Sequence, residues 1–302
     1  MRFFSEKQKQ TLHILATNNK RNLAATMKNF PLLFPALLLT TFINAQSCCQ
    51  KPDGMALFAT NAKFIASHEN PIPFNFQPDK GKMITFKAGD KEGNAYAVLS
   101  GKKTDKVVLM FHEWWGLNDY IKKEAESLQK ELGDGVDVYA VDLYDGQVAT
   151  EREKASALMS GLKPERASAI INGLLANIGK DKKVATIGWC MGGSWSLQAT
   201  LLAFRQAACV MYYGFPEKDP EKLKGLKTDI LFLQAMQDGF ITPSVVTQFS
   251  EDIKKLGKSI TIKQYNADHA FANPSNPKFN KEFAADAHKL ALAFLKKGLG
   301  VE

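Results

Sequence analysis

From residue 83 to the end of the sequence, short apolar runs alternate with longer amphipathic stretches, and this alternation limits the possible folds more than any other feature. Lys106–Phe111 (KVVLMF) is a near-continuous apolar run, which is typical of a strand that is buried on both faces of a parallel sheet. Asn118–Leu132 follows with apolar residues at helical spacing and ends at Gly133. The alternation predicts an α/β fold with a mostly parallel central sheet and helices on both of its faces.

The expected elements divide the chain into an N-terminal extension, residues 46–77, and a main domain, residues 78–302. The extension contains one expected short helix, Met55–Ser67. In the main domain, strands are expected at 83–86, 95–100, 106–111, 136–141, 184–188, 208–213, 230–235 and 260–265, with a turn at Asp90–Gly93 between the first two. Helices are expected at 118–132, 150–160, 164–178, 191–204, 243–256 and 281–297.

Residues 27–45 have the pattern of a secretory signal peptide. A short basic start, Met27-Lys28, precedes an apolar run, and small or neutral residues precede a cleavage position after Ala45. Residues 1–26 would then be an upstream extension, with Met1 and Met27 both open as the start of translation. We therefore expect an exported protein, with a lipid anchor on Cys48 as a weaker alternative.

Charge and cysteine content exclude two classes of protein. The formal net charge is +8, but residues 1–45 carry six basic side chains against one acid, which leaves 33 basic and 30 acidic side chains in the rest. Those lysines are dispersed rather than clustered with aromatic residues, so no nucleic-acid-binding surface is expected. Four cysteines in 302 residues do not form a disulfide scaffold.

A candidate nucleophile, Cys190, stands where the expected strand 184–188 meets the following helix, in Gly188-Trp189-Cys190-Met191-Gly192-Gly193. A nucleophile elbow needs a sharp turn at this place, with small neighbours that let the backbone approach closely. The amide of Met191 would begin the helix and face a developing oxyanion. An ordinary buried cysteine beside a glycine-rich turn is the alternative interpretation.

Two further candidates follow in the chain order nucleophile, acid, base that hydrolases of this fold use. Asp238 comes directly after the strand 230–235, and His269 comes after the last strand. Catalytic groups of open α/β sheets gather at such carboxyl ends of strands. Asp268 is a rival acid, but a residue adjacent to the histidine is poorly placed to reach its ring.

Phe111-His112-Glu113-Trp114-Trp115-Gly116 ends the strand 106–111. In folds of this kind the second amide of the oxyanion hole comes from this loop, and the backbone N–H of Trp114 is the candidate. Glu113 is a carboxylate at a buried strand end, where an unpaired charge is costly. Either Glu113 takes part in catalysis, or it forms an ion pair within a wall of packed aromatic side chains.

Over residues 80–300 the chain resembles the dienelactone hydrolase family. The matching stretches are HEWWG (112–116), DLYDG (142–146), GWCMGG (188–193), QDGF (237–240) and ADHAF (267–271). The resemblance implies an α/β-hydrolase fold and a carboxylic ester hydrolase that cleaves a small ester or lactone without metal or cofactor. It also implies a catalytic triad of Cys190, Asp238 and His269, and an oxyanion hole formed by the amides of Trp114 and Met191.

The resemblance assigns further roles around this triad. Glu113 matches a buried glutamate that holds the resting thiol and helps to generate the thiolate when substrate arrives. Arg152 matches an arginine that binds the substrate's carboxylate. The family's prototype has a tyrosine where this chain has Ser156, and a second arginine where it has Asn273.

With two of the three anion-binding groups replaced, a carboxylate-bearing substrate is less expected, and Trp115 and Trp189 are candidates to line a more apolar pocket. Two other classes stay open: a non-hydrolytic small-molecule-binding protein on the same fold, and a thiol redox protein that pairs Cys190 with another cysteine. No metal site is expected, because His112 and Glu113 are too close along an extended segment and other ligand types are scattered. The expected assembly is a monomer or weak dimer.

Overall fold

The computed structural model describes residues 54–301, which contain an eight-stranded sheet. The strands lie in the order β1-β2-β4-β3-β5-β6-β7-β8. Pairing is antiparallel between β1 and β2 and between β2 and β4, and parallel everywhere else. The strands are β1 (Lys82–Ala88), β2 (Lys91–Val98), β3 (Lys106–Phe111), β4 (Asp137–Asp142), β5 (Lys183–Trp189), β6 (Arg205–Tyr212), β7 (Ile230–Ala235) and β8 (Ile260–Tyr265).

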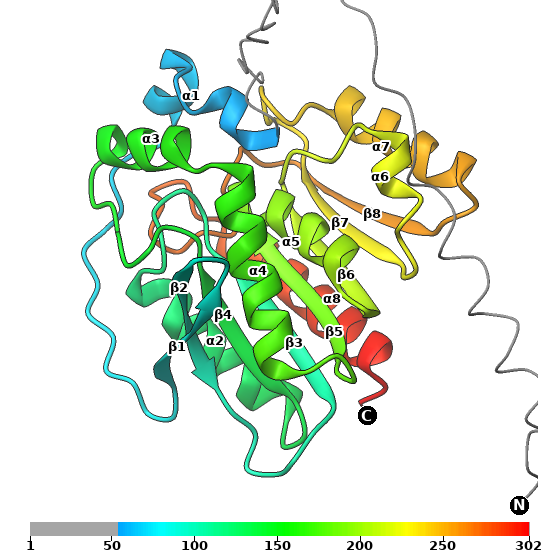
Figure 1. Cartoon of the computed structure of the whole chain (residues 1–302). Helices are drawn as coiled ribbons and strands as arrows, with labels where there is room; N and C mark the ends of the chain where they lie inside the picture. The colour runs from blue at the N-terminus through cyan, green and yellow to red at the C-terminus, as the bar shows by residue number, and fades with distance from the viewer. Residues whose placement is uncertain (1–53, 302) are drawn as a thin grey trace, which may run out of the picture. The chain divides into compact units, whose positions relative to one another are not determined.

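Helices cover both faces of this sheet, which confirms the predicted α/β class (Figure 1). On one face α4 packs against β1 and β2, and α5 packs against β3, β5 and β6. On the other face α2 packs against β4, and α8 packs against β5, β6 and β7. The longer helices are α2 (Asp119–Leu132), α3 (Arg152–Gly161), α4 (Pro164–Ile178), α5 (Met191–Leu202), α7 (Pro243–Lys255) and α8 (Lys281–Leu299).

Burial along the strands explains their composition. Every residue of β7 is buried, and so are all residues of β3 and β4 after the first. Strands with a helix layer on each face need apolar side chains on both sides, which is why these runs read as continuous rather than alternating. By contrast β8, at the edge of the sheet, has one buried residue, Tyr265.

The hairpin between β1 and β2 corrects one prediction. The chain turns at Gly89 and Asp90, because Ala88 pairs with Lys91, and residues 91–93 belong to β2 rather than to a turn. Gly89 has a φ of +72°, a conformation that glycine adopts without strain. Gly93 lies inside the strand because the ring of Phe86 fills the space that a Cβ would need.

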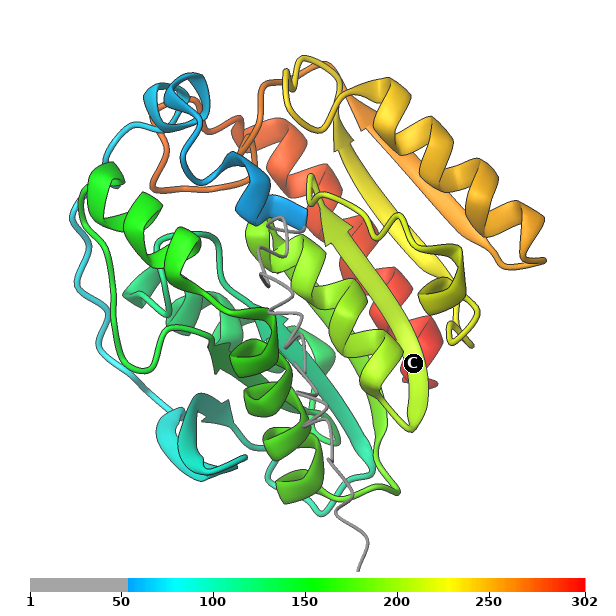
Figure 2. The ribbon, with the colours of Figure 1, turned by 45° about the horizontal axis from the view of Figure 1, so that its top comes forward.

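The N-terminal extension forms two short elements rather than the one expected helix. They are the 3₁₀ turn η2 (Gly54–Phe58) and the helix α1 (Ala62–Ser67). Asn61 separates them, since its side chain accepts hydrogen bonds from the amides of Lys63 and Phe64 and begins a new helix there. Both elements lie near the N-terminal end of α5 (Figure 2).

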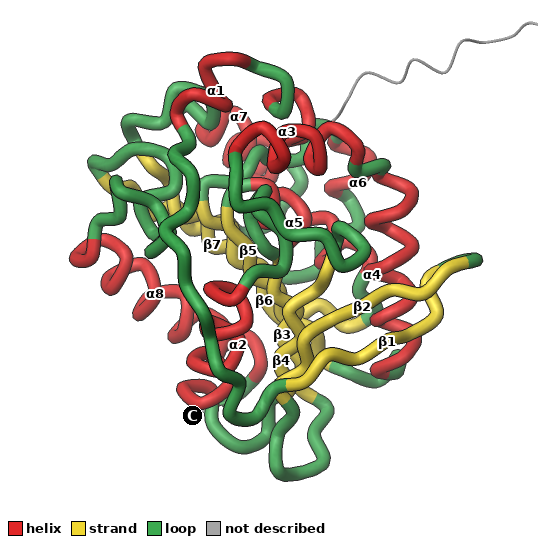
Figure 3. The backbone as a smooth tube through the Cα atoms, turned by 90° about the vertical axis from the view of Figure 1, so that its left-hand side faces the viewer, coloured by secondary structure: helices red, strands yellow, loops and turns green. Residues whose placement is uncertain are grey.

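A long loop then leads from α1 to β1 and passes along α2 (Figure 3). The amide of Phe76 donates to Asp119, and the hydroxyl of Tyr120 donates to the carbonyl of Ile72. Glu126 accepts hydrogen bonds from the amides of residues 79–81. The loop is therefore tied to α2 along its length.

The signal segment 27–45 and Cys48 lie outside the described residues. Among the residues that are described, no helix is both long and apolar enough to span a bilayer. One short helix that the sequence analysis did not predict, α6 (Pro220–Leu223), follows β6. Its four residues are too few for a periodic apolar pattern to reveal it.

Candidate active site

Cys190 occupies a strained turn between β5 and α5. Its φ of 55° and ψ of −120° are rare for a residue with a side chain. A Cβ on Gly188 would collide with the carbonyl of Gly192, and one on Gly192 would collide with the carbonyl of Phe111. Only glycine at these two places lets the first turn of α5 pack directly on the ends of β5 and β3.

His269 and Asp238 meet at the carboxyl ends of β8 and β7. His269 Nδ1 is 2.5 Å from Asp238 Oδ2, and the amides of Phe240 and Ile241 donate to Asp238 Oδ1. The rival acid, Asp268, pairs instead with Lys278 at 3.2 Å. Because Asp238 holds Nδ1, the second nitrogen of the ring, Nε2, is left for chemistry; it is buried and has no hydrogen-bond partner among the described residues.

Burial and neighbouring charged groups act in opposite directions on the pKa values of His269 and Cys190. Burial lowers the pKa of His269, but the charges of Asp238 and Cys190 outweigh burial and raise that pKa well above the ordinary value. Burial raises the pKa of the Cys190 thiol, while His269 and the Met191 amide act in the opposite direction. The resting thiol is thus held by burial in its protonated form, beside a base that favours its ionisation.

The loop after β3 carries the second candidate amide of an oxyanion hole. His112 Nε2 accepts a hydrogen bond from the amide of Leu143, so its Nδ1 is protonated and donates to the carbonyl of Glu113. This bond fixes the path of the loop at Glu113. The backbone N–H of Trp114 then has no acceptor among the described residues, and it is available to a ligand.

The Asp142–Gly146 stretch (DLYDG) supports that loop from the end of β4. Asp142 accepts hydrogen bonds from the amides of Tyr144 and Gly146. The Tyr144 hydroxyl reaches the sulfur of Met191 at 3.2 Å. This stretch therefore links the loop after β3 to the start of α5.

Glu113 is buried, and its carboxylate is held by two side chains. It accepts hydrogen bonds from the Tyr213 hydroxyl at 3.2 Å and from the side-chain amide of Asn273. Burial raises the pKa of Glu113 to about 7. No hydrogen bond joins Glu113 to Cys190, although its charge acts on the thiol. The carboxyl group is therefore poised to gain or lose a proton near neutral pH.

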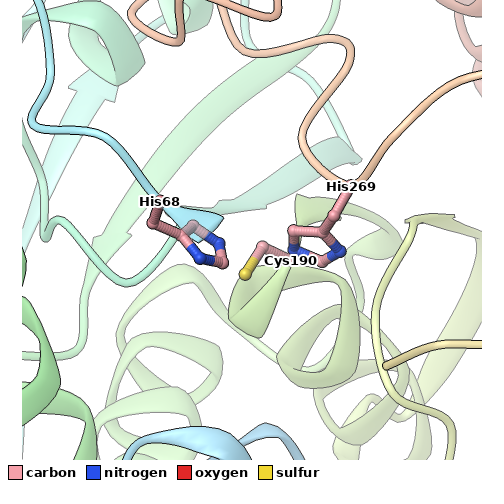
Figure 4. Close-up of side chains that lie close together, drawn as sticks. All are labelled: His68, Cys190 and His269. Atoms are coloured by element: carbon pink, nitrogen blue, oxygen red, sulfur yellow. The ribbon is translucent and has the colours of Figure 1, made fainter. Parts of the chain in front are cut away.

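His68 reaches the nucleophile from the N-terminal extension. A ring nitrogen of His68, a ring nitrogen of His269 and Cys190 Sγ lie within 4.8 Å of one another. Figure 4 shows the Cys190 side chain between the two imidazole rings. His68 Nδ1 donates to the carbonyl of Phe64 at 2.7 Å, and burial, aided by the charge of His269, lowers its pKa to about 3. Its ring is therefore neutral, with the lone pair on Nε2.

We define residues 54–72 as the cap, because they cover the candidate site. Phe64 packs edge-on against Trp114 and Phe240, and Phe58 packs in the same way against Phe215 and Phe240. As a result, Cys190 is only 1% exposed and His68 only 4%. We therefore expect access to the sulfur to require movement of the cap.

Two hydrogen bonds join the cap to α3. The Ser156 hydroxyl donates to the carbonyl of Ala59 at 2.7 Å, and the amide of Arg152 donates to the Asn70 side chain at 2.9 Å. The Arg152 side chain is 41% exposed and pairs with Glu153. Its predicted contact with substrate stays a prediction, since its guanidinium is turned to the neighbouring carboxylate.

A cavity of about 210 Å³ adjoins the site on the side of α2 and α8. Trp115 and Trp189 both line it, as do Glu113 and Asn273, whereas Cys190 does not. The two tryptophans that the sequence analysis assigned to a pocket therefore share one. Glu113 stands at the boundary, since it lines the cavity and its charge also reaches the thiol.

Sequence reasoning missed two residues of the site. Tyr213 directly follows β6, so a polar side chain at a strand end was a usable signal. His68 is a single histidine in the extension, and nothing in its neighbourhood indicates that it reaches Cys190. Cys209, the other described cysteine, is buried beside Ser196, and both described cysteines are free thiols.

Residues 94–299 match the sequence model of the dienelactone hydrolase family. A carboxymethylenebutenolidase of a Pseudomonas species is 28% identical over 232 residues, covering 72% of this chain and 95% of that protein. The protein usf of Aquifex pyrophilus is 26% identical over 230 residues, covering 72% and 99%. The cap lies outside the family match.

Solved structures share the fold at low identity. A dienelactone hydrolase-like promiscuous phosphotriesterase from metagenomic libraries has a TM-score of 0.63 at 18% identity, covering 72% of this chain and 98% of its own. A dienelactone hydrolase of Anabaena variabilis has a TM-score of 0.51 at 20% identity, covering 72% and 97%. The predicted α/β-hydrolase fold is thereby confirmed.

Proposed function

The chain belongs to the dienelactone hydrolase family, and we propose that it hydrolyses a small ester or lactone through a thioester formed on Cys190. The observation that carries this proposal is the strained turn that sets Cys190 beside His269, whose other ring nitrogen is 2.5 Å from Asp238. A nucleophile, a base and a group that orients the base thus follow one another in space.

In the proposed reaction, the thiol proton passes to Glu113, His269 carries a proton on Nε2 beside the thiolate, and Cys190 Sγ attacks the ester carbonyl. The amides of Trp114 and Met191 stabilise the oxyanion. The protonated His269 then gives its proton to the leaving alkoxide, and the acyl group remains on sulfur as a thioester. In the second half, His269 removes a proton from water, which attacks the thioester and releases the acid and the thiol.

Glu113 assists the first step in this proposal. Its pKa of about 7 lets it take the thiol proton near neutral pH, when substrate alters the hydrogen bonds that Tyr213 and Asn273 donate to it, and it returns this proton to the sulfur when the thioester is cleaved. The cavity beside Trp115 and Trp189 would receive the acyl or alcohol part of the ester. Asn273 gives this cavity no positive charge, and the one histidine that lines it, His288, is paired with Glu124 and Glu131, which favours uncharged substrates over carboxylates.

The first test is the hydrolysis of short-chain aryl esters and a panel of lactones by the protein and its Cys190→Ala variant. We expect the variant to lose hydrolysis, because Cys190 is the one thiol beside His269 among residues 54–301. Cys209→Ala is the matched control, since it removes the other buried thiol and should keep full activity. Equal activity in Cys190→Ala and the parent protein would remove Cys190 as the nucleophile.

The panel also separates the alternative function. A protein that binds esters or lactones with measurable affinity but hydrolyses none of them would be a non-hydrolytic binding protein on this fold. In that case Cys190→Ala should leave the binding affinity nearly unchanged. Cycling of a disulfide under mild oxidants, in place of hydrolysis, would indicate a redox protein.

A further inference from the structure

Three side chains that bind metals well meet where the cap covers the site, although all three are far apart in sequence. His68 comes from the cap, Cys190 from the turn before α5, and His269 from the loop after β8. One ligand atom of each lies within 4.8 Å of the other two (Figure 4). The sequence analysis expected no metal site because the ligand types are scattered along the chain, and the fold brings these three together.

Both histidines are oriented as metal-binding histidines are. A histidine that binds a metal usually donates its other ring N–H to a carboxylate or a backbone carbonyl, which fixes the tautomer and the ring orientation. His269 Nδ1 contacts Asp238 at 2.5 Å, and His68 Nδ1 contacts the carbonyl of Phe64 at 2.7 Å. In each ring Nε2 is thereby the nitrogen left for a ligand, and on His269 a metal would take the place of a proton.

These two Nε2 atoms are both buried and have no hydrogen-bond partner among the described residues. A buried polar atom without a partner destabilises a fold by about 1–3 kcal/mol, so such atoms are uncommon. Together with Cys190 Sγ, which lies within 4.8 Å of both, they form a set of three possible metal ligands. A cation that accepts all three pairs would satisfy both nitrogens together.

We propose that His68, Cys190 and His269 form a zinc site that inhibits the enzyme by holding the cap closed. Zinc prefers nitrogen and sulfur ligands in a tetrahedron, with Zn–N of about 2.0–2.1 Å and Zn–S of about 2.3 Å. Three protein ligands leave the fourth position to water, as in many zinc sites. Edges of such a tetrahedron are about 3.3–3.6 Å long, so the three ligand atoms need to draw closer by about 1 Å.

Binding of zinc would change three groups at once. Cys190 would lose its thiol proton to solvent as the Zn–S bond forms. His269 Nε2 would also release its proton to solvent and bond to the metal, so that this nitrogen could neither give nor take a proton. His68 would be bonded to the catalytic cysteine, which would stop the cap from moving aside. The inhibition rests on the proposed function, whereas the binding of metal does not.

Cobalt is the probe for the site, because Co²⁺ occupies zinc sites and absorbs light. The reduced, metal-free full chain is titrated with Co²⁺ alone. At one equivalent we expect a thiolate-to-cobalt absorption in the near ultraviolet and the strong visible bands of tetrahedral Co²⁺, both removed by Zn²⁺. The Cys190→Ala variant should lose the near-ultraviolet absorption.

His68→Gln and Ser67→Ala are the matched variants. The first removes the imidazole, and the second removes only the hydroxyl that lies 3.3 Å from His68 Nδ1. We expect His68→Gln to weaken Zn²⁺ affinity at least about tenfold, as loss of support at a metal site commonly does, and Ser67→Ala to bind nearly as the parent. Equal Zn²⁺ affinity in His68→Gln, or no thiolate absorption in the parent protein, would overturn the site.

Aryl-ester hydrolysis in the presence of Zn²⁺ completes the test. We expect inhibition that a chelator reverses, with about ten times more Zn²⁺ needed for His68→Gln, in line with its weaker binding. A cobalt spectrum of the expected form in a protein that hydrolyses nothing would mean that the proposed function fails while the site stands. Hydrolysis that Cys190 carries, without the spectrum, would mean the reverse.

Discussion

Asn273 and Ser156 stand at the two positions where this chain departs from the anion-binding residues of the family's prototype, and both make internal hydrogen bonds. Asn273 donates to Glu113, and Ser156 donates to the carbonyl of Ala59 in the cap. Neither side chain carries a charge. Both side chains are therefore used inside the protein, one to hold a buried glutamate and the other to hold the cap against α3.

Replacement of Glu113 by Gln tests the buried carboxyl group through the pH dependence of stability. The pKa of Glu113 is about 7 in the folded protein, above its ordinary value of 4.5. Below pH 4.5 the group is protonated in both states, so its contribution is fully present; it is lost as the pH rises through 7. We expect the stability of the parent relative to Glu113→Gln to fall by on the order of 3 kcal/mol between pH 4.5 and 8.

Urea unfolding of both proteins at several pH values between 4.5 and 8 measures this difference. Glutamine cannot titrate but keeps an acceptor for Tyr213, which makes it the closest neutral replacement. A stability difference that does not vary with pH would show that Glu113 titrates normally.

The strands and helices were largely predictable, because the apolar pattern of each segment indicates whether it is buried on both faces or on one. The turn around Cys190 was predictable for the same reason, since glycine at 188 and 192 is what a close backbone approach demands. The hairpin turn was misplaced, because Gly93 suggested a turn while its true role is to make room for Phe86. Contacts of the cap were not predictable, since the position of His68 depends on long-range packing.

The packing of Phe64 predicts how fast Cys190 reacts with alkylating reagents. Phe64, a residue of the cap, is fully buried against Trp114, and Cys190 is buried near it. Truncation of such a buried side chain lowers folding stability by about 3–5 kcal/mol. Because Phe64 belongs to the cap, we expect this loss to destabilise the closed position of the cap. We expect Phe64→Ala to speed the reaction of Cys190 with iodoacetamide at least about tenfold. A shift of about 1.4 kcal/mol in the free energy of cap opening is enough for this factor.

Mass spectrometry of the alkylated peptide measures this rate. Leu57→Ala is the matched control, because Leu57 lies in the same cap but is 43% exposed, and its rate should match that of the parent. If Phe64→Ala and the parent react at the same rate, the cap does not limit access to the sulfur.

Across the whole molecule, the candidate site is assembled at one end of the sheet from segments that adjoin β3, β5, β6, β7 and β8. The central strands among these are buried along most of their length, and the edges are not. Resistance to opening follows burial and hydrogen bonding. The centre of the sheet therefore forms a rigid support for the groups at its end.

Amide hydrogen exchange followed by mass spectrometry tests this gradient of stability. We expect peptides from β3 and β7 to exchange most slowly, since their amides are released only when the whole domain unfolds. Peptides from β1 and β8, at the two edges, should exchange faster by local opening. Equal protection from edge to centre would mean that the domain opens only as a unit.

The cap can also be regarded as a ligand that the chain carries with it. A ring nitrogen of His68 lies within 4.8 Å of Cys190 Sγ, while an ester carbonyl must come within about 3–3.5 Å of the attacking atom, so we expect a bound ester to displace the His68 ring. Every substrate therefore competes with a tethered group whose local concentration does not fall on dilution. Each 1.4 kcal/mol that favours the closed cap weakens apparent substrate affinity about tenfold. Substitutions in the cap alone can therefore change the substrate concentration at which the protein is half saturated.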